Sequence, residues 1–341
     1  MKYFLLLFLL LSPLCPAQTV TVDGVIFESL SEARPAIKDG SRVYLEKGIY
    51  AVGAYIKASN IEIIGEKGVV FDDAVADNKA ALVFSGDNVT VESIECRNIQ
   101  VNHKNGACIR FEGTNLTVRD LYAHDSQSGV MTSDNAGTVK IEYSKFERLG
   151  GKASGKGYAH AMYIKADTFT LFRSEIVDTQ GEGSGVKSRS NKTLVLESLL
   201  SSGKGNDSRL VDVANFGELI VQDSILQQGN KSSNSQLIAY GLEKKVERKF
   251  PINRIQMSNN IFIFDRIKAN VLISYRLADE VDIKDNIYIG DMLYPDNFVP
   301  NNKWYFTRKD AFIAELPYIP KLSDFEDVKF RTEHYGTLKQ L

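Results

Sequence analysis

Three stretches between His160 and Phe216 align with one another residue by residue, and this repeat constrains the fold more than any other feature of the sequence. They read HAMYIKAD, SGVKSRSN and RLVDVANF. Mostly apolar residues recur in two aligned columns: Met162, Val186 and Val211 in one, and Ile164, Ser188 and Val213 in the other. Residues two apart on a β-strand share a face. We therefore expect both columns to face a core.

The columns between and beside these carry polar residues of both charges. One column holds Tyr163, Lys187 and Asp212. The next column of the same parity holds Lys165, Arg189 and Ala214. The alternation predicts that they form a mixed-charge patch on the outer face of a regular scaffold.

Short alternating segments separated by Gly, Asn and Asp recur along most of the chain, with a period of about 20 to 30 residues. The core column extends through one residue of each repeat: Leu82, Ile109, Val130, Met162, Val186, Val211 and Ile238. An all-β parallel β-helix accounts for this, because each coil adds a rung about 4.8 Å from the last. A β-sandwich is the alternative, but it gives no reason for a column of like residues.

The two ends of the chain differ from this repeat. The segment SLSEARPAIKDG predicts a short amphipathic helix that caps the first coil. Residues 296–341 break the repeat and predict a cap that covers the edge of the last coil. Length alone would allow two domains, but repeat folds run long as single units, so we expect one β-helix domain over residues 18–295.

Residues 1–17 have the pattern of a cleavable signal peptide, with an apolar run followed by Pro16-Ala17. The mature chain is expected to be secreted or periplasmic, with no membrane partner. A net charge of −2 argues against a nucleic-acid partner. Cys96 and Cys108 remain in the mature chain. The sequence leaves two alternatives for this pair, a disulfide or two buried free thiols.

With these repeats, the chain resembles the right-handed parallel β-helix proteins of the pectate-lyase-like superfamily over roughly residues 20 to 295. Many of these proteins bind, cleave or epimerise acidic polysaccharides. The resemblance implies a right-handed β-helix with an acidic polysaccharide as its partner. We expect a monomer.

Two insertions frame the polar patch: ERLGGKASGKGYA before His160 and NKSSNS before Gln236. Loops that project from adjacent coils make walls, so the patch is expected to be the floor of a cleft. Arg110 and Glu112 would lie two coils away and are candidate substrate-binding residues.

Cleavage of a uronate chain by β-elimination requires a cation for the carboxylate, a base for the adjacent proton and an acid for the leaving oxygen. Arg189 fits the first role because arginine stays charged, and Lys187 fits the second because a neighbouring cation favours its neutral form. Tyr163 or His160 would be the acid. Asp212 would orient Lys187 or bind a metal ion.

Lys187-Ser188, followed about one coil later by Arg209, is similar to the catalytic Lys and Arg pattern of the β-helix alginate and chondroitin lyases. The resemblance makes Arg209 a substrate-binding candidate, and Lys165 is expected to assist Arg189. Calcium is a candidate cofactor, although the family's Asn-Gly-x-Glu motif is absent nearby. Ser184 stands where β-helix polygalacturonases have a histidine, which disfavours a hydrolase.

The first hypothesis is therefore a secreted polysaccharide lyase that cleaves a uronate-containing exopolysaccharide, such as a biofilm or matrix polymer. A polysaccharide C5-epimerase, a glycoside hydrolase and a non-catalytic carbohydrate-binding solenoid are the alternatives. Exposed charges on a sheet often form solvated ion pairs that contribute little, so each polar residue taken alone is more often structural. His103 and His124, in turn-rich segments, are expected at the surface.

Overall fold

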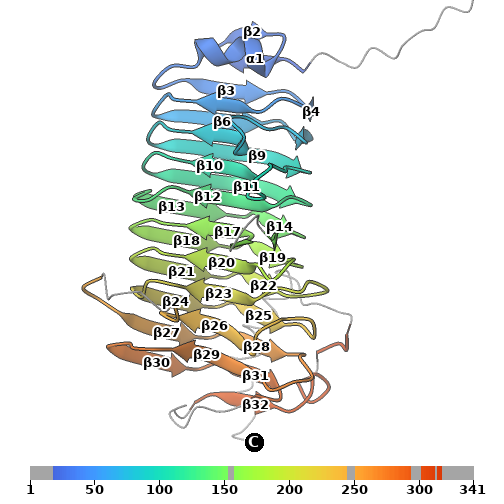
Figure 1. Ribbon diagram of the computed structural model, residues 1–341, viewed down its shortest axis with the longest axis vertical. Helices are drawn as coiled ribbons and strands as arrows, with labels where there is room; N and C mark the ends of the chain where they lie inside the picture. The colour runs from blue at the N-terminus through green and yellow to red at the C-terminus, as the bar shows by residue number, and fades with distance from the viewer. Residues whose placement is uncertain (1–17, 153–156, 244–249, 293–300, 312, 317–341) are drawn as a thin grey trace, which may run out of the picture.

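The computed structural model describes residues 18–152, 157–243, 250–292, 301–311 and 313–316. Within these ranges the chain forms a stack of coils that follow one another in sequence order from the N-terminal end, at the top of Figure 1, to the C-terminal end at the bottom. The predicted signal peptide and most of the predicted C-terminal cap lie outside the described residues. No described helix has the length and hydropathy needed to span a membrane.

One parallel sheet of nine strands runs along the stack and contributes one strand to each coil. The strands, in order along the sheet, are β5 (Ala54–Ile56), β8 (Ala80–Phe84), β10 (Ala107–Phe111), β12 (Ser128–Thr132), β17 (Met162–Ile164), β20 (Ser184–Ser188), β23 (Arg209–Val213), β26 (Gln236–Tyr240) and β29 (Val271–Tyr275).

A second sheet of 21 strands forms the other faces of the coils. Each coil contributes two of these strands, separated by a bend, and from β6 onward the first of the two follows a strand of the nine-stranded sheet. The first strands are β3 (Arg42–Leu45), β6 (Ile61–Gly65), β13 (Thr138–Glu142), β18 (Thr168–Phe172), β21 (Lys192–Leu196), β24 (Glu218–Gln222), β27 (Arg254–Ser258) and β30 (Glu280–Lys284). The second strands are β4 (Gly48–Tyr50), β7 (Val69–Asp72), β14 (Lys145–Glu147), β19 (Glu175–Val177), β22 (Leu199–Ser201), β25 (Ile225–Gln228), β28 (Ile261–Phe264) and β31 (Ile287–Gly290). In two coils, one long strand continues through the bend: β9 (Val89–Arg97) and β11 (Leu116–His124).

The predicted core column is confirmed by the strand pairing. Each of its seven residues is the Cα partner of the next. None of the seven is more than 1% exposed. Because side chains alternate between the two faces of a strand, the residues of the polar columns point outward, as predicted.

Small polar residues hold the bends of successive coils in line. The Oγ atom of Ser174 accepts a hydrogen bond from the backbone N–H of Ser144 and donates to the carbonyl of Phe172. Ser198 repeats both contacts one coil later, with the N–H of Ser174 and the carbonyl of Leu196. These hydrogen bonds pair backbone N–H and C=O groups that have no sheet partner at the bend. The buried serine hydroxyls are themselves hydrogen-bonded, so a row of them can stand in the interior.

The N-terminal end contains the predicted short helix. α1 (Leu30–Ala33) begins after Ser29, whose side chain accepts a hydrogen bond from the N–H of Glu32, and a 3-10 turn η1 (Arg34–Ala36) follows. The antiparallel strands β1 (Val20–Val22) and β2 (Val25–Phe27) pair with each other, and β1 also pairs with β3.

At the other end, β32 (Lys303–Tyr305) adds one more parallel strand to β31. Trp304 stacks on Tyr288 with ring centroids 4.4 Å apart. The buried ion pair between Arg308 and Asp265, at 2.6 Å, ties the segment after β32 to the last coils. The boundary predicted at residues 295 and 296 lies outside the described residues.

Two side-chain questions from the sequence are answered in the coils before the patch. Cys96 and Cys108 form a disulfide, with Cα atoms 5.7 Å apart. The prediction that His124 lies at the surface in a turn is wrong, because it ends β11 and is buried. Its two ring nitrogens contact Asp125 at 2.6 Å and Glu95 at 3.2 Å.

Candidate functional site

The floor of the candidate site is formed by β17, β20 and β23, which lie side by side in the nine-stranded sheet. Tyr163 is the Cα partner of Lys187, and Lys187 is the partner of Asp212. The column predicted from the sequence is confirmed. All three side chains point away from the core, because their neighbours Met162, Val186 and Val211 fill it.

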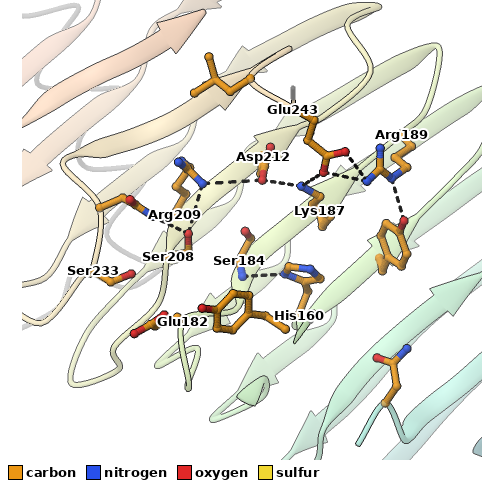
Figure 2. Close-up of a pocket in the computed structure, with 16 residues that line it drawn as sticks. His160, Glu182, Ser184, Lys187, Arg189, Ser208, Arg209, Asp212, Ser233 and Glu243 are labelled. Carbon is orange, nitrogen blue, oxygen red and sulfur yellow. Dashed lines mark hydrogen bonds and ion pairs between the residues drawn. The ribbon is translucent and has the colours of Figure 1, made fainter. Parts of the chain in front are cut away.

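Lys187 lies between two carboxylates (Figure 2). Its Nζ atom is 2.7 Å from Oδ2 of Asp212 and 2.8 Å from Oε1 of Glu243. The side chain is only 10% exposed, so Lys187 is not an ordinary surface residue. It faces outward but is covered by Glu243.

Arg189 is held on all three of its nitrogens. Nε donates to the hydroxyl oxygen of Tyr163 at 2.7 Å, and Nη1 donates to Oδ1 of Asn215 at 2.6 Å. Nη2 contacts both carboxylate oxygens of Glu243, at 2.8 Å and 2.7 Å. The guanidinium is therefore fixed in orientation, and its charge is paired with a carboxylate.

Glu243 was not predicted from the sequence, because it lies on a loop with no counterpart in the repeat. The loop leaves β26 at Gly241, which has a φ of +65°. A Cβ atom at this position would collide with the ring of Phe216. Glycine allows the chain to turn back over β20. Burial raises the pKa of Glu243, but hydrogen bonds from Lys187 and Arg189 outweigh it, and the net shift is downward.

Arg209 lies on the far side of Asp212 from Lys187 (Figure 2). It is the Cα partner of Ser184, as the sequence alignment predicted. Its Nη1 atom is 3.3 Å from the Ser208 hydroxyl and 3.9 Å from Asp212. Its Nε atom is buried and has no hydrogen-bond partner among the described residues. Arg209 is thus held less completely than Arg189.

His160 adjoins the floor at the start of β17. Its Nδ1 atom accepts a hydrogen bond from the backbone N–H of Ser184 at 2.9 Å. Burial lowers the pKa of His160 to about 4, and the positive charge of Lys187 contributes to the lowering. The neutral ring therefore carries its proton on Nε2 and acts as a hydrogen-bond donor at neutral pH.

These residues lie in a cavity of about 890 Å³. The predicted loop walls contribute to it, since Gly157 and Tyr158 come from one insertion and Ser233 and Asn234 from the other. The prediction of a walled cleft is borne out for the described part of both loops. A cavity of this size can hold several sugar units.

Three predicted residues lie outside the lining of this cavity. Lys165 pairs with Asp134 at 2.8 Å. Arg110 pairs with Glu112 at 3.3 Å, and Glu112 also binds Lys79 at 3.1 Å. They lie on the same outer face, where each is paired with a neighbouring opposite charge.

A metal site was left open by the sequence. Across the described ranges, no group of three or more His, Cys, Asp or Glu side chains is arranged to hold a metal ion. The carboxylates nearest Lys187, those of Asp212 and Glu243, are already paired with cations. This donor set does not fit a calcium ion at the floor.

Comparison with known proteins shows similarity in structure only. No protein-family model and no curated protein sequence matches the chain. Among solved structures, the pectate lyase Pel9A matches with a TM-score of 0.50 at 14% identity, covering 76% of this chain and 74% of that one. A pectin methylesterase bound to a hexasaccharide matches with a TM-score of 0.44 at 11% identity, covering 86% and 95%. An alginate lyase of family PL6 matches with a TM-score of 0.37 at 12% identity, covering 81% and 52%.

The pairing pattern and the match to Pel9A define the class of protein: the chain is an all-β, right-handed parallel β-helix. This is the fold that the repeats of the sequence predicted.

Proposed function

We propose that the protein is an exported polysaccharide lyase that cleaves a uronate-containing polysaccharide, such as a matrix exopolysaccharide, by β-elimination. The observation that carries the proposal is the placement of Lys187 and Arg189 in the floor of a polar cavity on a β-helix. The signal-peptide pattern supports export. The Cys96–Cys108 disulfide supports it too, because disulfides persist in oxidising compartments outside the cytosol.

Lys187 is the proposed base. The acidic proton of a uronate lies on the carbon bonded to the carboxyl group, so a carboxylate seated on Arg189 would bring that C–H bond beside Nζ of Lys187. A primary amine accepts a proton only in its neutral form, and Asp212 and Glu243 both stabilise the charged form. The reaction therefore requires Lys187 to give up its proton before the abstraction step, while Asp212 keeps the amine in place.

Tyr163 is the proposed acid, in preference to His160. Its hydroxyl oxygen accepts from Nε of Arg189, and no described residue accepts its proton. The proton is therefore available for the glycosidic oxygen, and the Arg189 charge would stabilise the phenolate left behind. A neutral imidazole is a weak acid, so we assign His160 to substrate binding through Nε2–H.

Arg189 is the proposed partner of the reacting carboxylate. Arg209 is the proposed partner of a neighbouring uronate, because its guanidinium lines the cavity and its Nη1 atom is 3.9 Å from Asp212, too far for a hydrogen bond. The proposed reaction does not use calcium, because the carboxylates near Lys187 are already paired with cations and do not fit a calcium ion.

The test is a screen of acidic polysaccharides, followed by the ultraviolet absorbance of unsaturated uronate products. We expect absorbance to rise with at least one polymer. New reducing ends without this absorbance would contradict the lyase and favour a hydrolase. Inverted uronate residues at unchanged chain length, seen by proton NMR, would favour an epimerase.

A second candidate function is a non-catalytic protein that binds an acidic polysaccharide. The observation that favours it is the pairing of Lys187 with two carboxylates, which suits a permanent cation better than a base. This function predicts saturable binding of acidic polymers with no unsaturated, shortened or epimerised product. Turnover by the wild-type protein would exclude it.

A further inference from the structure

The carboxylate of Glu243 is bound as a ligand carboxylate would be. One oxygen contacts Nζ of Lys187 at 2.8 Å, and both oxygens contact Nη2 of Arg189 at 2.8 Å and 2.7 Å. Charge-assisted hydrogen bonds from two cations to a single carboxylate are among the strongest polar contacts in proteins. Lys187 and Arg189 thus form a complete carboxylate-binding site.

Glu243 differs from its partners in where it is attached. Lys187, Asp212 and Arg189 lie on or beside strands whose positions are set by the ladder on both sides. Glu243 lies on the loop after Gly241. Its side chain is 38% exposed, against 10% for Lys187 and 22% for Arg189. The carboxylate is therefore the outermost member of the cluster, and it can move without breaking a strand pairing.

We propose that Lys187 and Arg189 form the binding site for the carboxylate of an acidic sugar, and that Glu243 occupies this site until the sugar replaces it. This inference rests on the proposed function and names the group that the substrate must displace. The replacement conserves charge at the site, since one carboxylate is exchanged for another.

Two consequences follow for specificity. A neutral sugar cannot replace Glu243 without leaving the Arg189 charge with no carboxylate partner and Lys187 with Asp212 alone, so the site discriminates in favour of acidic sugars. In addition, an acidic sugar binds only the fraction of molecules from which Glu243 has withdrawn, so its apparent affinity is reduced by that fraction. Removing the Glu243 carboxylate should therefore tighten the binding of an acidic sugar.

The experiment measures binding of D-galacturonate by calorimetry, with D-galactose as the neutral match. The proteins are the wild type, Glu243→Ala and Glu182→Gln. Glu182 also lines the cavity, so its substitution controls for the loss of one negative charge near the ligand. We expect Glu243→Ala to bind D-galacturonate roughly tenfold more tightly or better, as for a site at most about 10% open in the wild type. Glu182→Gln should change the affinity by no more than about threefold, since it removes no occupant.

The double variant Glu243→Ala, Lys187→Met tests whether the gain acts through the two cations. It should lose the added affinity, and thermal unfolding should show that each variant is folded. Unchanged or weaker D-galacturonate binding by folded Glu243→Ala would overturn the inference, and so would an equal gain for D-galactose. The lyase proposal is judged separately: tighter D-galacturonate binding without unsaturated product from any polymer would leave this inference standing and reject the lyase.

Discussion

Lys187 and Asp212 are opposite one another on adjacent strands, and their side chains meet at 2.7 Å beneath the Glu243 carboxylate. Both side chains are only 10% exposed. A lysine in this position has two roles, because it presents an amine to the cavity and its charge pairs with a buried carboxylate. Its substitution should affect stability as well as activity.

Lys187→Met should lower turnover by roughly 100-fold or more, the usual effect of losing a general base. It should also lower the free energy of unfolding by about 1–3 kcal/mol, because Asp212 loses its closest partner. Lys192→Met is the control, since Lys192 is 32% exposed and lies 3.8 Å from Glu218. It should cost no more than about 0.5 kcal/mol. Urea unfolding and product absorbance measure the two effects, and full activity in Lys187→Met would reject it as the base.

Tyr163→Phe removes only the hydroxyl that Arg189 contacts. We expect kcat to fall by roughly 100-fold, as for loss of a general acid, with KM changed by less than about threefold. Tyr55→Phe is the matched control, because Tyr55 belongs to the same outward column four coils nearer the N-terminus. A large rise in KM at unchanged kcat would assign Tyr163 to binding instead.

The register of the coils could be predicted from the sequence because side chains alternate between the two faces of a strand. Once one residue is assigned to the core, the face of every other residue in that strand follows. The apolar column through Val186 fixed the face of Lys187 and Asp212 at once. What covers that face could not be predicted, because Glu243 lies on a loop that the repeat does not contain. The only local signal is Gly241 at the end of a strand, and many glycines end strands without placing a carboxylate over a lysine.

The error at His124 has a related cause. Asp120 and Asp125 gave the segment the composition of a turn. In the structure the chain bends at Asp120, which has a φ of +49°, but the strand β11 continues through the bend to His124. Some of the groups that cover His124 come from an adjacent coil. Glu95, for example, is 29 residues earlier in the chain. Contacts of this kind depend on the stacking of coils and are not encoded in the local sequence.

Val186→Asp tests the inward column. Val186 is fully buried, so an aspartate there would place an unpaired carboxyl group in the apolar core at a cost of several kcal/mol. We expect the variant to unfold at a much lower temperature or to be insoluble. Val52→Asp is the control, since Val52 is 57% exposed and should tolerate the charge. Circular dichroism melting of the two variants compares them, and equal melting temperatures would contradict the register.

The last prediction concerns Asp207, a buried carboxyl group in the coil that carries Arg209. Its Oδ1 atom accepts from the Ser232 hydroxyl at 2.6 Å, and its Oδ2 atom has no hydrogen-bond partner in the described structure. Burial raises the pKa of Asp207 from 3.8 to about 6. The folded state therefore holds this proton more tightly than the unfolded chain does. The associated stability is fully present below pH 3.8 and is lost as the pH rises through about 6, a total of about 3 kcal/mol.

His160 acts in the opposite direction over nearly the same range. Its pKa is lowered from 6.5 to about 4, so its contribution is present above pH 6.5 and is lost as the pH falls through about 4. The two effects oppose each other, and the wild type should show little net change in stability from these groups between about pH 4 and 6. In Asp207→Asn only the His160 effect remains, so the free energy of unfolding should rise with pH between about pH 4 and 6. In His160→Gln only the Asp207 effect remains, so the free energy of unfolding should fall with pH over the same range. Urea unfolding of the three proteins from pH 3.5 to 8 measures this, and parallel profiles for both variants would show that neither group titrates as the structure indicates.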